Sequence, residues 1–343
     1  MGGGNKCGKT DIGEAAIDCM KILVTGAAGF IGSHLIPSLL AKGHSVCGLF
    51  RYSTTGSDNS KRRVGKLEAL QAASKGTFQI LRCEDYKSLP ELLKKKFQPE
   101  ICVHLAGRSW VRESIGWPEL YVDANYRSTV GLIEAMYRSQ CRRVVFASTV
   151  MVYGKDAPLP YTEDVVGSAP ASPYGASKLA CEVLLNSYHA LHKMETVNLR
   201  LFSVYGPDLR QDLVPYLIAT AILKNKPFTV FGDGSSARDY IDVRDVISAI
   251  EAACLGNESH AALNVGSGFG TTLLELVNLL ETALGKKAEL VYKPAVAGEL
   301  PLAIPDITVS MEKLKWEPAI SIEQGMVTLA DWFKSKDCPL HPA

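Results

Sequence analysis

The chain contains 343 residues, of which 47% are hydrophobic and 21% are charged, and its formal net charge at pH 7 is +1. This composition excludes a disordered chain, and the balanced charge argues against a nucleic-acid or membrane-surface binder. No apolar run approaches the roughly 20 residues that a membrane span requires, so we expect no membrane partner. At this length, one large domain with a smaller one is the expected organisation.

From Lys21 onward, short apolar segments alternate with helical patterns. Ile22 to Val24 is too short for a helix and is typical of a strand buried on both faces. Residues 1–20, before it, are predicted to be a disordered extension. In chain order, the predicted strands are 22–24, 45–50, 77–83, 101–105, 143–148 and 196–201, and the predicted helices start near Gly29 and cover 89–97, 121–139 and 174–193.

Strands that alternate with helices imply right-handed crossovers and a parallel sheet covered on both faces. The predicted fold class is therefore α/β, with a doubly wound dinucleotide-binding Rossmann domain over residues 21–204. Within it, the polar stretch 54–63 is predicted to be a loop with a basic tip.

Beyond Val204 the pattern changes, because proline and glycine become frequent and short strands mix with helices. We predict that residues 205–333 form mainly a smaller, interleaved substrate-binding lobe. Part of it, about 240–266, is predicted to return to the main sheet. The last residues, 334–343, are predicted to be a tail.

The cysteines and histidines give no sign of a disulfide framework or a metal site. The nine cysteines are scattered, odd in number and never form C-x-x-C, which is typical of reduced thiols in the cytoplasm. His34, His189 and His192 do not cluster with cysteines or carboxylates at the spacing of metal ligands. We therefore predict a cytoplasmic protein that holds no metal.

Three glycines follow the first predicted strand at three-residue spacing: Gly26, Gly29 and Gly32. In a dinucleotide-binding turn, one glycine permits the tight turn, one lets the backbone approach a pyrophosphate, and one lets the helix pack closely on the strand. The N-terminus of the following helix offers unpaired N–H groups to the phosphates. By itself this spacing also suits ordinary turns, so the remaining motifs decide the interpretation.

A second motif, Y-x-x-x-K, stands at Tyr174 and Lys178 at the head of a predicted helix. Residues four apart lie on one helical face, so the ammonium can lie beneath the phenol. A nearby cation stabilises phenolate and lowers the tyrosine pKa, which makes tyrosine usable as a base. Ser148 and Thr149 close a predicted strand at the carboxyl edge of the sheet, where ligands bind in such folds.

The glycine loop, the strand-end hydroxyls and Y-x-x-x-K, in this order, closely resemble the extended short-chain dehydrogenase/reductase family of NAD(P)-dependent sugar-nucleotide epimerases and dehydratases. The resemblance implies that Tyr174 is the acid/base, that Lys178 tunes it and holds the nicotinamide ribose, and that Thr149 with Ser148 bonds the reacting sugar oxygen. It also implies a set of cofactor contacts, at Gly26, Gly29, Phe30, Ile31, Gly32, Leu105, Ala106, Asn125, Tyr174 and Lys178.

Two further patterns resemble the UDP-glucuronate 4-epimerases of this family. After Thr149, where dehydratases resemble T-D-E, this chain has aliphatic residues, which disfavours elimination of water. The resemblance places Ser203 and Arg210 at the sugar carboxylate, for which a planar guanidinium is a natural partner. The alternative is that Arg210 only tops a surface loop. Two more substrate contacts are implied, at Arg112 and at Arg238, and Leu302 stands where the family has a phosphate-binding arginine.

The cofactor can be either NAD or NADP. Phe50 and Arg51, followed by Ser53, stand where an NAD enzyme carries an aspartate for the ribose 2′-OH, and an arginine with hydroxyls suits a 2′-phosphate. This local signal favours NADP, whereas the resemblance to epimerases favours NAD. Both remain open.

The sequence thus predicts a C4 epimerase of a nucleoside-diphosphate sugar, either a UDP-uronate or a UDP-hexose, that works through a transient 4-ketosugar. The first alternative is an NADPH-dependent ketosugar reductase, and the second is a non-catalytic dinucleotide-binding protein. The resemblance and the apolar faces of the helices 125–139 and 174–193 also imply a homodimer.

Overall fold

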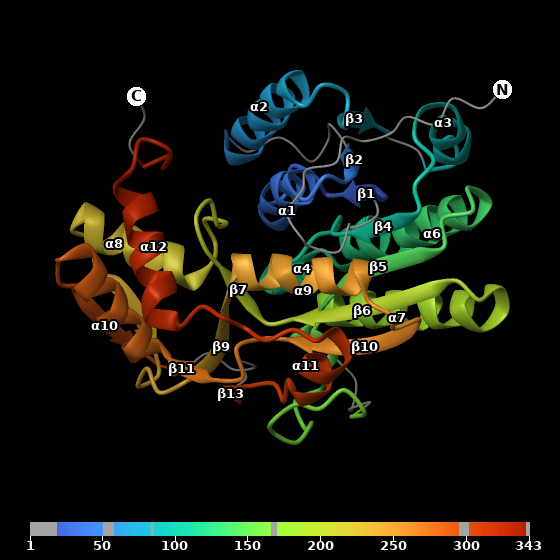
Figure 1. Cartoon of the computed structure of the whole chain (residues 1–343). Coiled ribbons are helices and arrows are strands. Elements are labelled where there is room, and N and C mark those ends of the chain that lie inside the picture. The colour runs from blue at the N-terminus through green and yellow to red at the C-terminus, as the bar shows by residue number, and fades with distance from the viewer. Residues whose placement is uncertain (1–18, 51–57, 84–85, 166–169, 295–301, 341–343) are drawn as a thin grey trace, which may run out of the picture.

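The computed structural model describes residues 19–50, 58–83, 86–165, 170–294 and 302–340. Its centre is a seven-stranded, all-parallel sheet with the order β10-β6-β5-β4-β1-β2-β3, so the fold class predicted from the sequence is confirmed (Figure 1). The strands are β1 (Lys21–Thr25), β2 (Ser45–Phe50), β3 (Phe78–Arg82), β4 (Ile101–His104), β5 (Arg143–Thr149), β6 (Glu195–Leu201) and β10 (His260–Val265).

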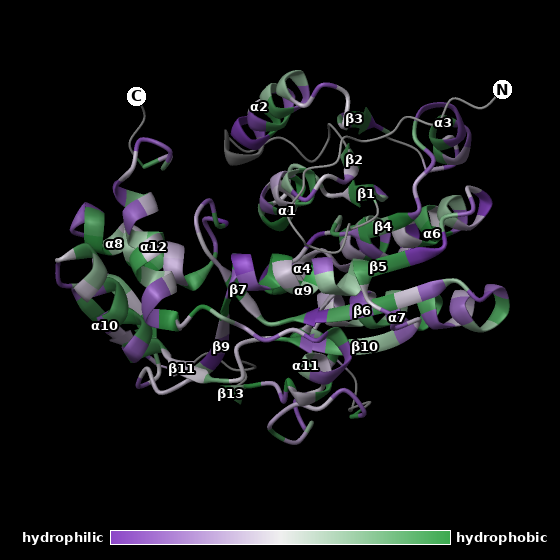
Figure 2. Cartoon of the chain, in the orientation of Figure 1, coloured by the Kyte–Doolittle hydropathy of each residue, from purple (hydrophilic) through white to green (hydrophobic). Residues whose placement is uncertain are grey.

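Helices cover both faces of this sheet, because its strands are apolar on both sides (Figure 2). In β1, Ile22 and Val24 belong to one buried cluster and Leu23 to the other. The first cluster lies under α1 (Phe30–Ala41) and α9 (Val243–Leu255), and the second lies under α3 (Leu89–Lys96), α6 (Ser128–Arg138) and α7 (Pro173–His192).

The smaller lobe packs three helices beside two small sheets (Figure 1). The chain returns from it to the main sheet, because α9 and β10 follow β9 directly, and β10 pairs with β6. No helix among the described residues is both long and apolar enough to span a membrane. The lobe comprises α8 (Val214–Lys224), α10 (Leu273–Leu284), α12 (Ile322–Lys334), β7 (Ser203–Tyr205), β8 (Phe228–Phe231), β9 (Ala237–Asp242), β11 (Gly270–Thr272), β12 (Leu290–Lys293) and β13 (Leu302–Ala303), and α11 (Thr308–Leu314) packs beside β10.

Two predicted segments are wrong in detail. The stretch 54–63 was predicted to be a loop, but α2 (Asp58–Ala73) begins within it. The single predicted helix 121–139 is divided into α5 (Pro118–Tyr121), a π-helical segment η2 (Val122–Arg127) and α6. Neither difference follows from apolar periodicity, because α2 is mostly polar and the π turn carries Asn125, which is held by tertiary hydrogen bonds.

Helix α2 is tied to the smaller lobe by the carboxylate of Asp208. Arg62 donates to Asp208 Oδ1, and Arg63 Nε lies 3.4 Å from the same oxygen. Arg63 also donates through Nη2 to the backbone oxygen of Asp208 at 2.8 Å. Asp208 itself has a left-handed backbone with φ of 64°, a conformation that Asp and Asn tolerate better than most residues. These contacts fix the chain segment that leads to Arg210.

We expect Asp208→Asn to destabilise the protein by about 3 kcal/mol, because it leaves two arginines, one of them buried, without their carboxylate. Asparagine keeps the size and tolerates the left-handed backbone, so the change isolates the charge. Urea unfolding of both proteins measures the difference. Asp331→Asn, at an exposed position of α12, is the control and should leave the unfolding free energy unchanged; equal effects of the two substitutions would refute the tie.

Candidate active site

The turn between β1 and α1 has the shape that a dinucleotide pyrophosphate requires. Gly26 has φ of +69°, and a Cβ there would lie 2.8 Å from the backbone nitrogen of Ala106. Gly29 is the N-cap of α1 and offers no side chain to cap the helix, and the first turn holds no acidic residue. A Cβ on Gly32 would collide with the Gly26 carbonyl. The bare helix terminus therefore fits an anionic phosphate group.

Phe30 and Ile31 open α1, where Phe30 is buried and stacks edge-on against His34. Two other proposed cofactor residues, Leu105 and Ala106, follow β4, and the backbone nitrogen of Ala106 donates to Thr25 Oγ1 at 3.2 Å. Arg51 and Ser53, on which the preference for NADP rests, lie outside the described residues.

Asn125 fastens the loop after β4 to helix α7. Its amide oxygen accepts from Arg108 N at 2.7 Å, and its amide nitrogen donates to Arg108 O at 3.0 Å and to Ser177 Oγ at 2.9 Å. A Cβ on Gly107 would lie 2.9 Å from the Asn125 oxygen and 3.5 Å from Lys178 Nζ. The loop therefore needs glycine at this position to approach both groups. The side chain of Asn125 acts on the site by holding the backbone of this loop.

Tyr174 begins helix α7, which Ser172 caps by accepting from Gly175 N at 3.1 Å. Burial raises the pKa of Tyr174, while a hydrogen bond from Thr149 and the positive charge of Arg210 oppose this shift. Thr149 ends β5, so the strand and the helix meet at the phenol. This geometry suits a tyrosine that exchanges a proton with a hydroxyl bound beside Thr149.

Lys178 is buried one turn after Tyr174. Its ammonium donates to Ala147 O at 2.7 Å and lies 4.4 Å from the centre of the Phe146 ring. Burial lowers its pKa to about 8. Desolvation of the phenol is the largest cause of the raised pKa of Tyr174, and the groups that lower it are Thr149 and Arg210, so the tuning of Tyr174 by Lys178 stays a prediction.

The hydroxyl of Ser148 bonds a protein side chain, whereas the prediction placed it on the reacting sugar oxygen. It donates to Glu182 on α7, a carboxylate that Arg200 also binds at 2.9 Å. The Ser148 hydroxyl proton is therefore used within the protein, although Ser148 and Thr149 both reach side chains of α7. Ser148 thus helps to hold α7 against β5 and β6, and its predicted contact with the reacting sugar oxygen stays a prediction.

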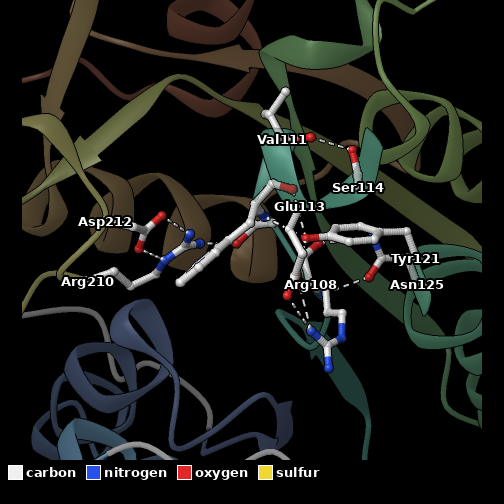
Figure 3. A network of polar contacts seen from close by, with 10 residues as sticks. Arg108, Val111, Glu113, Ser114, Tyr121, Asn125, Arg210 and Asp212 are labelled. Atoms are coloured by element: carbon white, nitrogen blue, oxygen red, sulfur yellow. Dashed lines mark hydrogen bonds and ion pairs between the residues drawn. The ribbon is translucent and has the colours of Figure 1, made fainter. Parts of the chain in front are cut away.

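The predicted substrate residues occupy three places. Arg210 donates through Nε to Asp212 at 2.9 Å and through Nη1 to Ser109 Oγ, and its guanidinium carbon lies 5.8 Å from the Trp110 ring centre (Figure 3). It is also close enough to influence the Tyr174 pKa. It therefore does more than top a surface loop.

Ser203 and Arg238 share one face of the small sheet, because Ser203 pairs with Tyr240 and Arg238 lies two residues before Tyr240 on β9. Both are half-buried. Arg112 lies at an exposed position of α4 (Val111–Gly116), while Ser114 of the same motif is buried and donates to Val111 O at 2.6 Å.

Tyr121 is an important residue that the sequence analysis did not select. It is fully buried, its ring centre lies 6.2 Å from that of Tyr174, and its hydroxyl lies 2.6 Å from Glu113 Oε2 (Figure 3). Its position four residues before Asn125 on a helical pattern was a usable signal. The pattern alone could not show that Tyr121 packs against the other helix.

A dinucleotide-binding turn and a buried Tyr-x-x-x-Lys helix at the carboxyl edge of a parallel sheet define a dinucleotide-dependent enzyme class. Residues 22–266 match the protein-family model described as the NAD dependent epimerase/dehydratase family. The match covers well over half of the chain, and the chain belongs to this family.

Several relatives extend along nearly the whole chain. A UDP-glucuronate 4-epimerase from Thermodesulfobacterium geofontis is 32% identical over 91% of this chain and 95% of its own. A UDP-glucose 4-epimerase from Mycolicibacterium smegmatis is 35% identical over 92% of this chain and 99% of its own. The solved UDP-glucuronic acid 4-epimerase from Bacillus cereus, in complex with UDP-glucuronic acid and NAD, is 33% identical with a TM-score of 0.82, covering 92% of this chain and 99% of that one.

Lys178→Met should stabilise the protein relative to wild type most strongly below pH 8, with the difference shrinking between pH 8 and 10.5. The pKa of Lys178 falls from 10.5 to about 8 on folding. The buried charge therefore lowers the unfolding free energy of the wild type below pH 8, and this free energy rises as the pH increases to 10.5. Methionine keeps the apolar stem without the charge. Urea unfolding across this range measures the difference, and a pH-independent one would show that Lys178 is not desolvated.

Proposed function

We propose that this protein is an NAD-dependent C4 epimerase of UDP-sugars, and that UDP-glucuronate is its preferred substrate. The observation that carries the proposal is the guanidinium of Arg210, held by Asp212 and Ser109 within electrostatic reach of Tyr174. The named relatives act on both UDP-glucuronate and UDP-glucose, which share the reacting carbon and differ at C6. The charge at Arg210 favours the acid.

Tyr174 is the group that exchanges a proton with the C4 hydroxyl, and Thr149 holds that hydroxyl through its own oxygen. Bound NAD would be held by the glycine turn and by Lys178, and it supplies a site that accepts and returns a hydride. A 4-ketosugar would result when the C4 hydroxyl gives its proton to the Tyr174 oxygen and the carbon C4 gives up its hydrogen as hydride. Turning of this ketosugar in the site would expose its other face. Val150 and Met151, after Thr149, carry no ionisable group for elimination of water.

Arg210 still has hydrogen-bonding capacity for a ligand. A guanidinium carries five N–H donors, and the contacts of Arg210 among the described residues use three of them. The remaining donors, on the two terminal nitrogens, can meet a sugar carboxylate. Ser203, at the start of β7, is the hydroxyl that we propose as its neighbour.

Arg210→Lys should lower kcat/KM for UDP-glucuronate by roughly thirtyfold, because a charged hydrogen bond of about 2 kcal/mol is lost with the planar fork. Its effect on UDP-glucose should be several-fold smaller. Tyr174→Phe should abolish turnover of both. NMR detection of the C4-inverted products measures the rates, and equal losses of Arg210→Lys on both substrates would remove the carboxylate role.

We also propose that two copies pair through α6 and α7. Two exposed apolar residues on α6, Val130 and Tyr137, are seven apart, and two on α7, Val183 and Leu191, are eight apart, so each pair lies on one helical face. An apolar stripe on two neighbouring helices suits a four-helix interface. The eight described cysteines form no disulfide, which supports a cytoplasmic location.

Val183→Glu should convert this dimer to a monomer, since it places a charge in the apolar stripe. Light scattering at working concentration measures the mass. Val291→Glu, at an exposed apolar position of β12 in the smaller lobe, is the control and should leave the mass unchanged. A wild type with monomeric mass would contradict the proposal outright.

A further inference from the structure

Trp110 lies at the end of the loop between β4 and α4, and its side chain is half exposed. Half of its surface, 50%, remains accessible, although tryptophan is usually among the more buried residues. It stands directly beside Ser109, which accepts from the guanidinium of Arg210. The exposed indole beside the proposed sugar site is available for contact with a ligand.

The backbone of Trp110 is held firmly, so its exposure does not reflect a loose loop. Trp110 N donates to the hydroxyl of Tyr121 at 3.2 Å, and the same hydroxyl lies 2.8 Å from Trp110 O. The single proton of that hydroxyl is shared between Trp110 O and Glu113, whose carboxylate also binds Arg108 at 3.2 Å. Figure 3 shows this network joining α4, α5 and the loop.

Trp110 also contacts two groups that lie near Tyr174. Tyr121, which holds its backbone, packs edge-on against Tyr174, with ring centres 6.2 Å apart. On the other side, the guanidinium of Arg210 lies 5.8 Å from the Trp110 ring centre, a distance at which the cation is attracted to the ring face. Trp110 is thus joined through its backbone to Tyr121 and through its ring to the guanidinium of Arg210.

We propose that Trp110 is a substrate-contacting residue that stacks on the sugar ring of the nucleotide sugar and selects for it together with Arg210. This inference rests on the proposed function. The C–H face of a pyranose is apolar, so it gains by covering an open indole, while its hydroxyls remain free for Thr149 and Tyr174. A carboxylate on the same sugar reaches the guanidinium beside the ring.

A contact between Trp110 and the sugar ring affects the binding of the nucleotide sugar but not the binding of the nucleotide alone. We would titrate the purified full-length protein with UDP-glucuronate and with UDP alone, by calorimetry, for the wild type, Trp110→Phe and Trp110→Ala. Trp110→Ala should weaken UDP-glucuronate by about tenfold and leave UDP unchanged, while Trp110→Phe should keep most of the affinity. Trp117→Ala, another exposed tryptophan seven residues along, is the matched control and should change neither.

Intrinsic fluorescence gives a second readout, because UDP-glucuronate should quench the wild type and this quenching should disappear in Trp110→Phe. If Trp110→Ala binds both ligands as tightly as the wild type, or loses both equally, the inference is overturned and the proposed function stands. If the wild type binds neither ligand, the proposed function is overturned, and this inference with it.

Discussion

The whole site depends on the contact between the end of β5 and the first two turns of α7. There a strand-end threonine bonds the buried Tyr174, and the ammonium of Lys178 donates a hydrogen bond to the β5 carbonyl of Ala147. Burial disfavours the charged form of both groups: it raises the pKa of the Tyr174 phenol and lowers the pKa of the Lys178 ammonium. Moving the helix by one turn would separate Tyr174 from Thr149.

The residues around this contact hold α7 in its position relative to β5. Behind it, Glu182 on α7 is bound by Ser148 and Arg200, which join the helix to β5 and β6 through buried polar bonds. In front of it, Asn125 holds the loop after β4 to the same helix. On the side of the smaller lobe, Asp208 lies two residues before Arg210 and accepts hydrogen bonds from α2, which fixes this segment of the chain. The groups that we propose for catalysis and for substrate binding are thus positioned from three sides: by β5 and β6, by the loop after β4, and by the smaller lobe.

Much of this arrangement was predictable from the sequence, and the reasons are local. Three local patterns each predict the structure of their own segment: a buried strand, glycines at fixed spacing, and Tyr174 four residues before Lys178. The parallel sheet follows from the alternation of strands and helices along the chain. What the sequence could not predict depends on contacts between distant segments. Helix α2 is held by Asp208, some 145 residues away, Ser148 turns toward Glu182, and Trp110 lies beside Arg210 only after folding.

The central claim is that the C4 centre is inverted within one site without exchange of its hydrogen with solvent. The most direct measurement uses UDP-glucuronate that carries deuterium at C4, incubated with the purified protein in ordinary water, and follows the C4-inverted product by NMR and mass. The account predicts that the product keeps the deuterium at C4. A C4-inverted product with hydrogen there, taken from water, would contradict it.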